Sequence, residues 1–266
     1  MRQECVPALV QARRLVSDYG LREPEDISVE AIALDLGVYV VEAPLKGSSA
    51  RLIRQGNGGL VRVNSGIRSE GQKRFCVAHE LGHFVLHEKM SQLVFCTSKD
   101  MLLGYQQQPE EAEANAFAAE LLMPEPFFRE KCFQGELRLR TLEGLARLFR
   151  TTISATAYRY VELGAHVCAA VGTEKGMIRW VLACPDFGFR LPGRGSRLDA
   201  RTCAGEFFFR RRGEKTEEDV PAAAWLDDGR VEETWSIREI LIPMPYYRSA
   251  LSVLWVVPGS ALDVLD

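Results

Sequence analysis

The chain has 266 residues, enough for one large domain or two moderate ones. A net charge of −3 gives no global basic field of the kind that binds nucleic acid, and the 47% hydrophobic and 26% charged content is that of an ordinary globular protein. The sequence opens without an apolar signal core, and no apolar run approaches the roughly 18 residues of a membrane helix. Seven scattered cysteines without a Cys-x-x-Cys pair argue against a disulfide framework or a cysteine zinc site. We therefore expect a cytoplasmic protein with no membrane segment.

The first quarter of the chain predicts two helices, a strand and a hairpin. Apolar periodicity indicates an amphipathic helix at residues 6–18 and a second helix at 29–36, with Ser28 as its N-cap. The β-branched run at 38–41 is typical of a strand. Residues 51–63 read as two strands around a glycine-rich turn, which is a hairpin pattern. A small sheet of this kind has an edge that can bind an extended peptide by strand addition.

The stretch that carries chemistry is His79-Glu80-x-x-His83, which lies in the proline-free run from Arg68 to Met90. On a helix, His79 and His83 are i and i+4, so their imidazoles lie on one face, roughly 6 Å apart along the axis. Both can reach one tetrahedral Zn²⁺ at about 2.0–2.1 Å. Glu80 lies beside that ion, where it can accept a proton from a water molecule. The motif predicts two zinc ligands and a general base.

His87 extends the motif to three histidines, and only four occur in the whole chain. His79 and His87 are separated by about 12 Å of helical rise, which is too far for both to bind one ion. A pair of His83 and His87 would have no adjacent acid, because Phe84 follows His83. We take His87 as a histidine at the helix end or behind the ligands. Chance is a poor explanation for three histidines gathered in one nine-residue span.

A third ligand is expected on the acidic helix predicted between Pro109 and Pro124. Glu111 shares a helical face with Asn115, which could orient it by a hydrogen bond. Glu113 lies about 200° around the helix from Glu111. The pattern alone favours Glu111 but leaves Glu113 open.

Three ordered motifs resemble those of a known family. They are His79-Glu-Leu-Gly-His83, then Glu111-x-x-Ala114-Asn115-x-Phe117-Ala118 running into Leu121-Leu-Met-Pro124, then Leu145-Ala-x-x-Phe149 with Ile153-Ser154. Their order and spacing resemble the ImmA/IrrE family of metallopeptidases over about residues 1–165.

The resemblance implies a zincin-like, gluzincin-type peptidase domain. Carried across by position, it makes His79, His83 and Glu111 the metal ligands and Glu80 the base, with Asn115 behind them. The ion implied is Zn²⁺, with Mn²⁺ as an alternative. The family's members are similar to site-specific cytosolic endopeptidases that cleave helix-turn-helix repressors. The substrate implied is therefore an XRE-type repressor whose removal releases stress-response or mobile-element genes.

Residues 141–164 have the outline of a helix-turn-helix, with two short helices joined at 150–153 and Ser154 as cap of the second. Five arginines add local positive charge: Arg138, Arg140, Arg147, Arg150 and Arg159. One interpretation is DNA binding through Ser154–Tyr160. The alternative is a helical pair packed on the peptidase core, or one that docks the repressor. We favour packing and do not expect direct DNA binding, because the protein is acidic.

From His166 onward the sequence shows short apolar runs separated by glycine, proline and charged residues. A hairpin is predicted at 167–182, followed by apolar runs at 205–209, 235–242 and 250–257. The run Phe207-Phe-Phe-Arg210 is interpreted as a strand that ends in a basic turn rather than as a single-strand binder. All four tryptophans lie in this part, and core packing explains them better than a ligand pocket, although a small-molecule signal is an open role. By placement, the segment resembles the GAF-like domain of the radiation-response branch of the family.

We therefore predict an α+β protein in three parts: a zincin-like peptidase domain at 1–133, a helix-turn-helix-like pair at 134–164 and a GAF-like α+β regulatory domain at 165–266. The expected function is site-specific zinc endopeptidase activity on a repressor. Its oxyanion would need a stabiliser besides the ion, with Tyr105, Tyr158 and Tyr160 as candidates. The rival functions are a DNA-binding regulator with a structural metal and a sensor or scaffold without catalysis.

Overall fold

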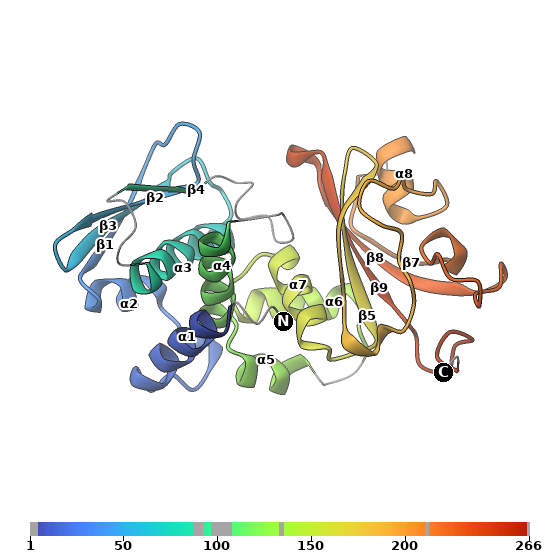
Figure 1. The fold of residues 1–266 in the computed structure, drawn as a ribbon, viewed down its shortest axis with the longest axis horizontal. Helices are drawn as coiled ribbons and strands as arrows, with labels where there is room; N and C mark the ends of the chain where they lie inside the picture. The colour runs from blue at the N-terminus through green and yellow to red at the C-terminus, as the bar shows by residue number, and fades with distance from the viewer. Residues whose placement is uncertain (1–4, 88–92, 97–107, 133–135, 211–212, 265–266) are drawn as a thin grey trace. The chain divides into compact units, whose positions relative to one another are not determined.

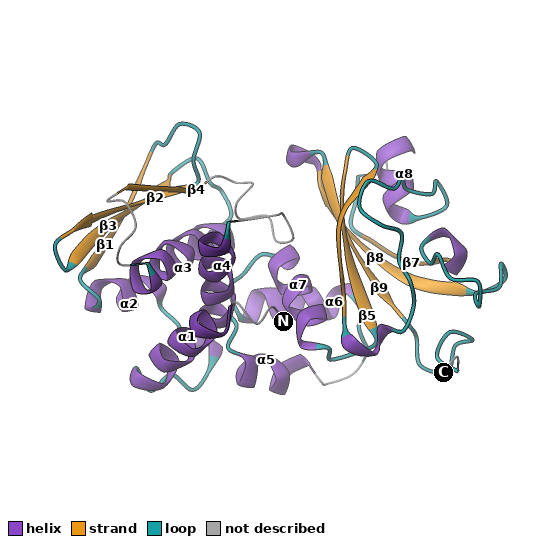
Figure 2. Cartoon of the chain, in the orientation of Figure 1, coloured by secondary structure: helices purple, strands orange, loops and turns teal. Residues whose placement is uncertain are grey.

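The computed structural model describes residues 5–87, 93–96, 108–132, 136–210 and 213–264. The chain packs as two compact units, the first made of Met1–Lys131 and Leu145–Ala155, and the second of Cys132–Gly144 and Thr156–Asp266. Helices and two separate sheets confirm the predicted mixed α+β class (Figure 2). The division into three parts with boundaries at 133 and 164 stays a prediction. Within the described residues, no helix is both long enough and apolar enough to cross a bilayer.

The first unit contains a four-stranded sheet in the order β1-β3-β2-β4 (Figure 1). Its strands are β1 Val38–Ala43, β2 Ala50–Gln55, β3 Gly58–Asn64 and β4 Leu93–Cys96. β1 runs parallel to β3, whereas β2 is antiparallel to both β3 and β4. The predicted strand at 38–41 and the hairpin at 51–63 are confirmed. Leu52 and Val61 pair across the hairpin and are fully buried, so one face of the sheet forms part of the core.

The described helices that precede residue 133 lie in the same part of the chain as this sheet. They are α1 Val6–Asp18, α2 Val29–Asp35, α3 Glu70–Leu86, α4 Pro109–Leu122 and α5 Glu125–Cys132. The predicted cap of α2 is confirmed, because the Ser28 hydroxyl accepts a hydrogen bond from the Ala31 N–H. Ser69 caps α3 in the same way by accepting from the Gln72 N–H. The helix that carries the histidines therefore begins at a fixed residue.

Close packing of α3 on α4 sets the position of the functional side chains. A Cβ atom on Gly82 would lie 3.0 Å from the Ala114 Cα and 3.2 Å from the Phe117 ring, so α4 would have to move by a few tenths of an ångström to admit it. On the far side of α4, the buried Glu120 carboxylate accepts a hydrogen bond from Arg13 of α1 at 2.9 Å. α4 is thus held between α1 and α3, which fixes it along its length.

We expect Gly82→Ala to lower the free energy of unfolding by about 1–3 kcal/mol, because the added methyl group overpacks the helix contact. It should also weaken metal binding, since the two helices must separate. Gly144→Ala is the matched control, because a Cβ there meets no atom within 4 Å, and this change should stabilise its helix by up to about 1 kcal/mol. Urea unfolding followed by far-ultraviolet circular dichroism measures both. Equal stability of the two variants would contradict the packing described.

The predicted helical pair is present as α6 Leu139–Leu148 and α7 Ile153–Leu163. The predicted cap was wrong. The Thr152 hydroxyl, rather than that of Ser154, accepts a hydrogen bond from the Ala155 N–H, and Ser154 lies inside α7. Arg150 adopts a left-handed φ of 53° just after the end of α6, and α7 begins at Ile153, so Thr152 is the residue that precedes α7. A helix-turn-helix function for the pair stays a prediction.

The second unit contains an antiparallel five-stranded sheet in the order β6-β5-β9-β8-β7. Its strands are β5 Cys168–Glu174, β6 Met177–Ala183, β7 Thr216–Pro221, β8 Ser236–Met244 and β9 Ser249–Trp255. These bounds confirm the hairpin at 167–182 and strands within the last two apolar runs. Trp225 and Trp255 are each 1% exposed, as expected of tryptophans that pack the core. The GAF-like assignment and the small-molecule signal stay predictions.

The strand predicted near Phe207 was wrong, because residues Cys203–Arg210 form helix α8. A triple phenylalanine run is typical of a strand, but a distant acid determines the structure here. The fully buried Glu239 of β8 accepts hydrogen bonds from the N–H groups of Cys203 and Ala204 at 2.8 and 3.0 Å. It therefore satisfies the first turn of α8 and favours a helix. Four short 3₁₀ turns complete the described elements: Pro24–Asp26, Pro185–Phe187, Ala222–Ala224 and Pro245–Tyr247.

Candidate metal centre

His79 and His83 lie on the face of α3 that packs against α4, and both are at most 1% exposed. Their Nε2 atoms are 3.1 Å apart. The i, i+4 spacing places the two rings one above the other, at a centroid distance of 4.8 Å. The predicted helical face therefore presents two nitrogen ligands to one point.

Glu111 reaches the same point from the first turn of α4. Its Oε2 lies 3.2 Å from His79 Nε2 and its Oε1 lies 3.2 Å from His83 Nε2. Burial alone would raise the pKa of Glu111, but hydrogen bonds and charge from the two histidines outweigh it and hold that pKa well below its usual value. The site therefore keeps the carboxylate ionised, as a ligand must be.

The donor set fits a small divalent ion. Ligand atoms of these three residues all lie within 4.8 Å of one another. Donors about 2.0–2.2 Å from a tetrahedral ion are separated by about 3.3 Å, close to the 3.1–3.2 Å found here. Two imidazoles and one carboxylate leave the fourth tetrahedral position for another ligand, which is the pattern of catalytic rather than structural zinc sites.

Hydrogen bonds behind the ligands orient both imidazoles. His79 Nδ1 lies 2.9 Å from Asn115 Oδ1, so the ring donates its Nδ1–H to the amide oxygen and directs the Nε2 lone pair inward. His83 Nδ1 lies 3.1 Å from His87 Nδ1, and His87 Nε2 lies 2.8 Å from Glu113 Oε2. If His87 donates to Glu113, then His83 donates to His87 through its Nδ1–H. With Nδ1–H of each ligand held in this way, loss of the Nε2 protons that the rings direct at Glu111 leaves both Nε2 lone pairs for a metal.

The predicted residues fall into three groups. His79, His83 and Glu111 come together, whereas Glu113 binds His87 instead of joining them. Glu80 follows His79 on α3 and is fully buried. Its role as base stays a prediction.

None of the three tyrosines named as oxyanion candidates is a described residue of the first unit. Tyr105 lies outside the described residues. Tyr158 packs edge-on against Trp180 in the second unit. Tyr160 belongs to the same unit, and its hydroxyl is hydrogen-bonded to His166 Nδ1 at 2.6 Å. The role of all three tyrosines at the oxyanion therefore stays a prediction.

Arg54 contributes to the site and could not be predicted from the sequence. The Nη2 group of this β2 side chain donates hydrogen bonds to the carbonyls of His83 and Phe84, at 2.6 Å each. Its guanidinium also lies over the Phe84 ring. It thereby satisfies carbonyl groups at the end of α3, where no glycine cap exists and a cation is favoured. No local pattern relates Arg54 to a helix some 30 residues further along the chain.

Asn115→Ala should lower the affinity for Zn²⁺ by about 10–100-fold, because the His79 ring loses the partner that fixes its tautomer and orientation. Competition with a chromophoric chelator measures the dissociation constant. Asn57→Ala in the exposed turn between β2 and β3 is the control and should bind zinc as the wild type does. An unchanged affinity in Asn115→Ala would mean that Asn115 does not orient His79 for metal binding.

Comparisons with known proteins show similarity in sequence and in fold. Residues 33–160 match the model of the IrrE N-terminal-like domain, the M78 peptidase family. A solved structure described as a Mycobacterium tuberculosis transcriptional regulator has a similar fold, with a TM-score of 0.62 and 16% sequence identity over 94% of this chain and 76% of that one. No curated protein matches the chain significantly. Residues 33–160 of the chain are therefore similar in sequence to the IrrE N-terminal-like domain of the M78 peptidases.

Proposed function

We propose that the protein is a metal-dependent endopeptidase that cleaves an XRE-type helix-turn-helix repressor in the cytoplasm. The observation that carries the proposal is the convergence of His79, His83 and Glu111 from two packed helices, with donor atoms 3.1–3.2 Å apart. Zn²⁺ is the ion that fits two imidazoles and one carboxylate best, and Mn²⁺ is the alternative. Each imidazole has a partner on its outer nitrogen, which is how catalytic sites hold a ligand in place.

The residues of the chain divide the reaction between them. His79, His83 and Glu111 hold the ion, which when bound would act as a Lewis acid on the scissile carbonyl and lower the pKa of water. Glu80 accepts a proton from the attacking water and delivers it to the leaving amine nitrogen as the peptide bond breaks. Glu80 therefore ends the reaction in its starting, ionised state. The burial of Glu80 excludes competing water from this transfer.

The helical pair gives less support to a DNA-binding regulator. Arg138 bonds to both Glu136 and Glu217, so its charge is neutralised. Arg159 is 3% exposed and pairs with Glu162. Two of the five arginines that suggested DNA binding are therefore paired with acids, which supports the packing interpretation.

The direct test is cleavage of a helix-turn-helix protein encoded beside this gene. Purified protein loaded with Zn²⁺ should cut it at one site, identified by intact-mass spectrometry, and excess 1,10-phenanthroline should stop the reaction. Restoring Zn²⁺ should restore cleavage. Should the repressor stay intact while the protein binds duplex DNA with a steep salt dependence, the regulator would replace the peptidase as the function.

A further inference from the structure

The strand β1 forms an edge of the first sheet that pairs with no other strand within the described residues. The hydrogen bonds between β1 and β3 show which backbone groups of β1 point toward β3 and which point to the outer edge. Gly59 N–H donates to the Gly37 carbonyl and Ser65 N–H donates to the Ala43 carbonyl. Backbone groups of alternate residues point to the same side of a strand, so the odd-numbered residues of β1 are directed toward β3.

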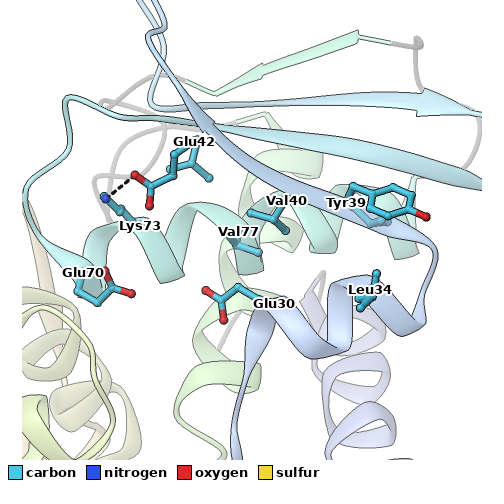
Figure 3. Close-up of a pocket in the computed structure, with 10 residues that line it drawn as sticks. Glu30, Leu34, Tyr39, Val40, Glu42, Glu70, Lys73 and Val77 are labelled. Carbon is cyan, nitrogen blue, oxygen red and sulfur yellow. Dashed lines mark hydrogen bonds and ion pairs between the residues drawn. The ribbon is translucent and has the colours of Figure 1, made fainter.

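The even-numbered residues of β1 therefore direct their backbone N–H and C=O groups away from β3. Val38 is fully buried, so the open part of this edge consists of Val40 and Glu42. A row of such groups at the natural strand spacing is a template for one more strand. The side chains of Val40 and Glu42 point from β1 toward α3 and α2 (Figure 3). An added strand would lie beside the backbone of these two residues.

A groove of about 350 Å³ runs along this edge, between β1 on one side and α2 and α3 on the other (Figure 3). Leu34, Val40 and Val77 provide apolar surface in it. Leu34 is 59% exposed, and Tyr39 at the rim is 65% exposed. The groove therefore offers apolar contacts next to unpaired backbone groups, which is what an extended peptide requires.

The charges of the groove specify its occupant. Three of its lining residues are acids, Glu30, Glu42 and Glu70, and one is a base, Lys73. Lys73 is already bonded to Glu42 at 2.6 Å (Figure 3). The buried Arg74 interacts with Glu30 and Glu70 from behind but is 1% exposed. The open face of the groove is therefore acidic and favours a segment that carries lysine or arginine.

We infer that the β1 edge and its groove dock an extended, basic segment of the repressor, in the conformation of an added fifth strand. Proteins that bind DNA carry lysine and arginine on their surface, which complements Glu30 and Glu70. The inference rests on the proposed function, since the segment belongs to its substrate. Docking at this edge holds the repressor to the enzyme through contacts other than those at the scissile bond.

The experiment is amide hydrogen exchange of the full-length, metal-free protein with and without the repressor encoded beside this gene. Metal-free protein is used so that cleavage does not occur during the measurement. The amides of Val40 and Glu42 should exchange at least about tenfold more slowly in the complex. The amides of Tyr39 and Val41 already bond to β3 and should change little.

Two variants test the same contact by affinity. Val40→Pro removes an outward N–H without touching the β1–β3 ladder and should weaken repressor binding by about tenfold. Glu30→Arg should weaken binding by about 3–10-fold, with the difference shrinking at high salt. Glu25→Arg is the charge control, since this exposed acid does not line the groove. It should bind as the wild type does.

The outcomes separate the two proposals. If the zinc enzyme cleaves the repressor while neither exchange nor affinity responds at β1, the docking inference is wrong and the peptidase stands. If β1 is protected and both variants bind weakly, yet nothing is cut, the docking stands and the peptidase is wrong. Protection of the same amides in the protein alone, rising with its concentration, would make the occupant a second copy of this chain and overturn the inference.

Discussion

A Glu80→Gln variant should bind Zn²⁺ as the wild type does and yet cleave the repressor roughly 10²–10⁴-fold more slowly. The amide has nearly the shape of the carboxylate, so the ligands His79, His83 and Glu111 keep their positions. What the variant lacks is a group able to accept a proton from water and return it to the leaving nitrogen. The loss should therefore fall on kcat rather than on KM.

Two measurements on the same samples check this result. Metal content by inductively coupled plasma mass spectrometry shows whether the site is loaded, and single-turnover cleavage gives the rate. Glu110→Gln is the matched control, because it makes the same chemical change one residue before a ligand and should cleave at the wild-type rate. Equal cleavage by Glu80→Gln and wild type would mean that Glu80 is not the base, and the mechanism would be wrong.

Glu239→Ala should be the most destabilising of the substitutions considered, lowering the free energy of unfolding of the second unit by about 3–5 kcal/mol. The carboxylate is fully buried and accepts four hydrogen bonds. Two come from the first turn of α8, one from the Trp225 indole and one from the Ser252 hydroxyl. Burial raises the pKa of Glu239, while these donors act in the opposite direction. Alanine would leave all four donors buried without an acceptor. The desolvation of these donors costs more free energy than is gained by no longer burying the acid.

Tryptophan fluorescence reports this effect selectively, because all four tryptophans belong to the second unit. Urea unfolding of Glu239→Ala should show a lower midpoint by fluorescence, while Zn²⁺ affinity at the first unit is unchanged. The urea midpoint of Glu239→Gln should lie between those of the wild type and Glu239→Ala. Its side-chain amide keeps one oxygen as an acceptor, but its NH₂ group faces two of the four donors. Glu232→Ala, an exposed acid of the same unit, is the control. A wild-type midpoint for Glu239→Ala would show that the network contributes little.

What could be predicted from the sequence was local. The spacing of His79 and His83 fixes their common helical face whatever surrounds the helix, so these two were found directly. The shared face with Asn115 favoured Glu111, and the family resemblance strengthened that choice, but the pattern left Glu113 open because only the packing of α4 on α3 separates the two acids. The partners of these residues, such as Arg54 and the contact of His87 with Glu113, depend on tertiary structure and had no local signal.

The errors have the same origin. α8 was taken for a strand because three consecutive phenylalanines are typical of one, and the acid that supports its first turn lies 36 residues later on β8. Thr152 and Ser154 are chemically equivalent as caps, so the choice between them depends on the residue at which α7 begins. The pattern predicts which elements exist, but their ends are decided by contacts distant in the chain.

The guanidinium of Arg54 has a mechanical consequence. Because it joins a sheet strand to the main-chain oxygens of His83 and Phe84, β2 and the last turn of α3 are coupled and must shift together. A force on the hairpin is then transmitted to the backbone that carries His83, although no side chain of the sheet has to touch the ion. A molecule that binds the sheet and displaces β2 would thus change the position of His83 and, with it, the affinity of the site for a metal.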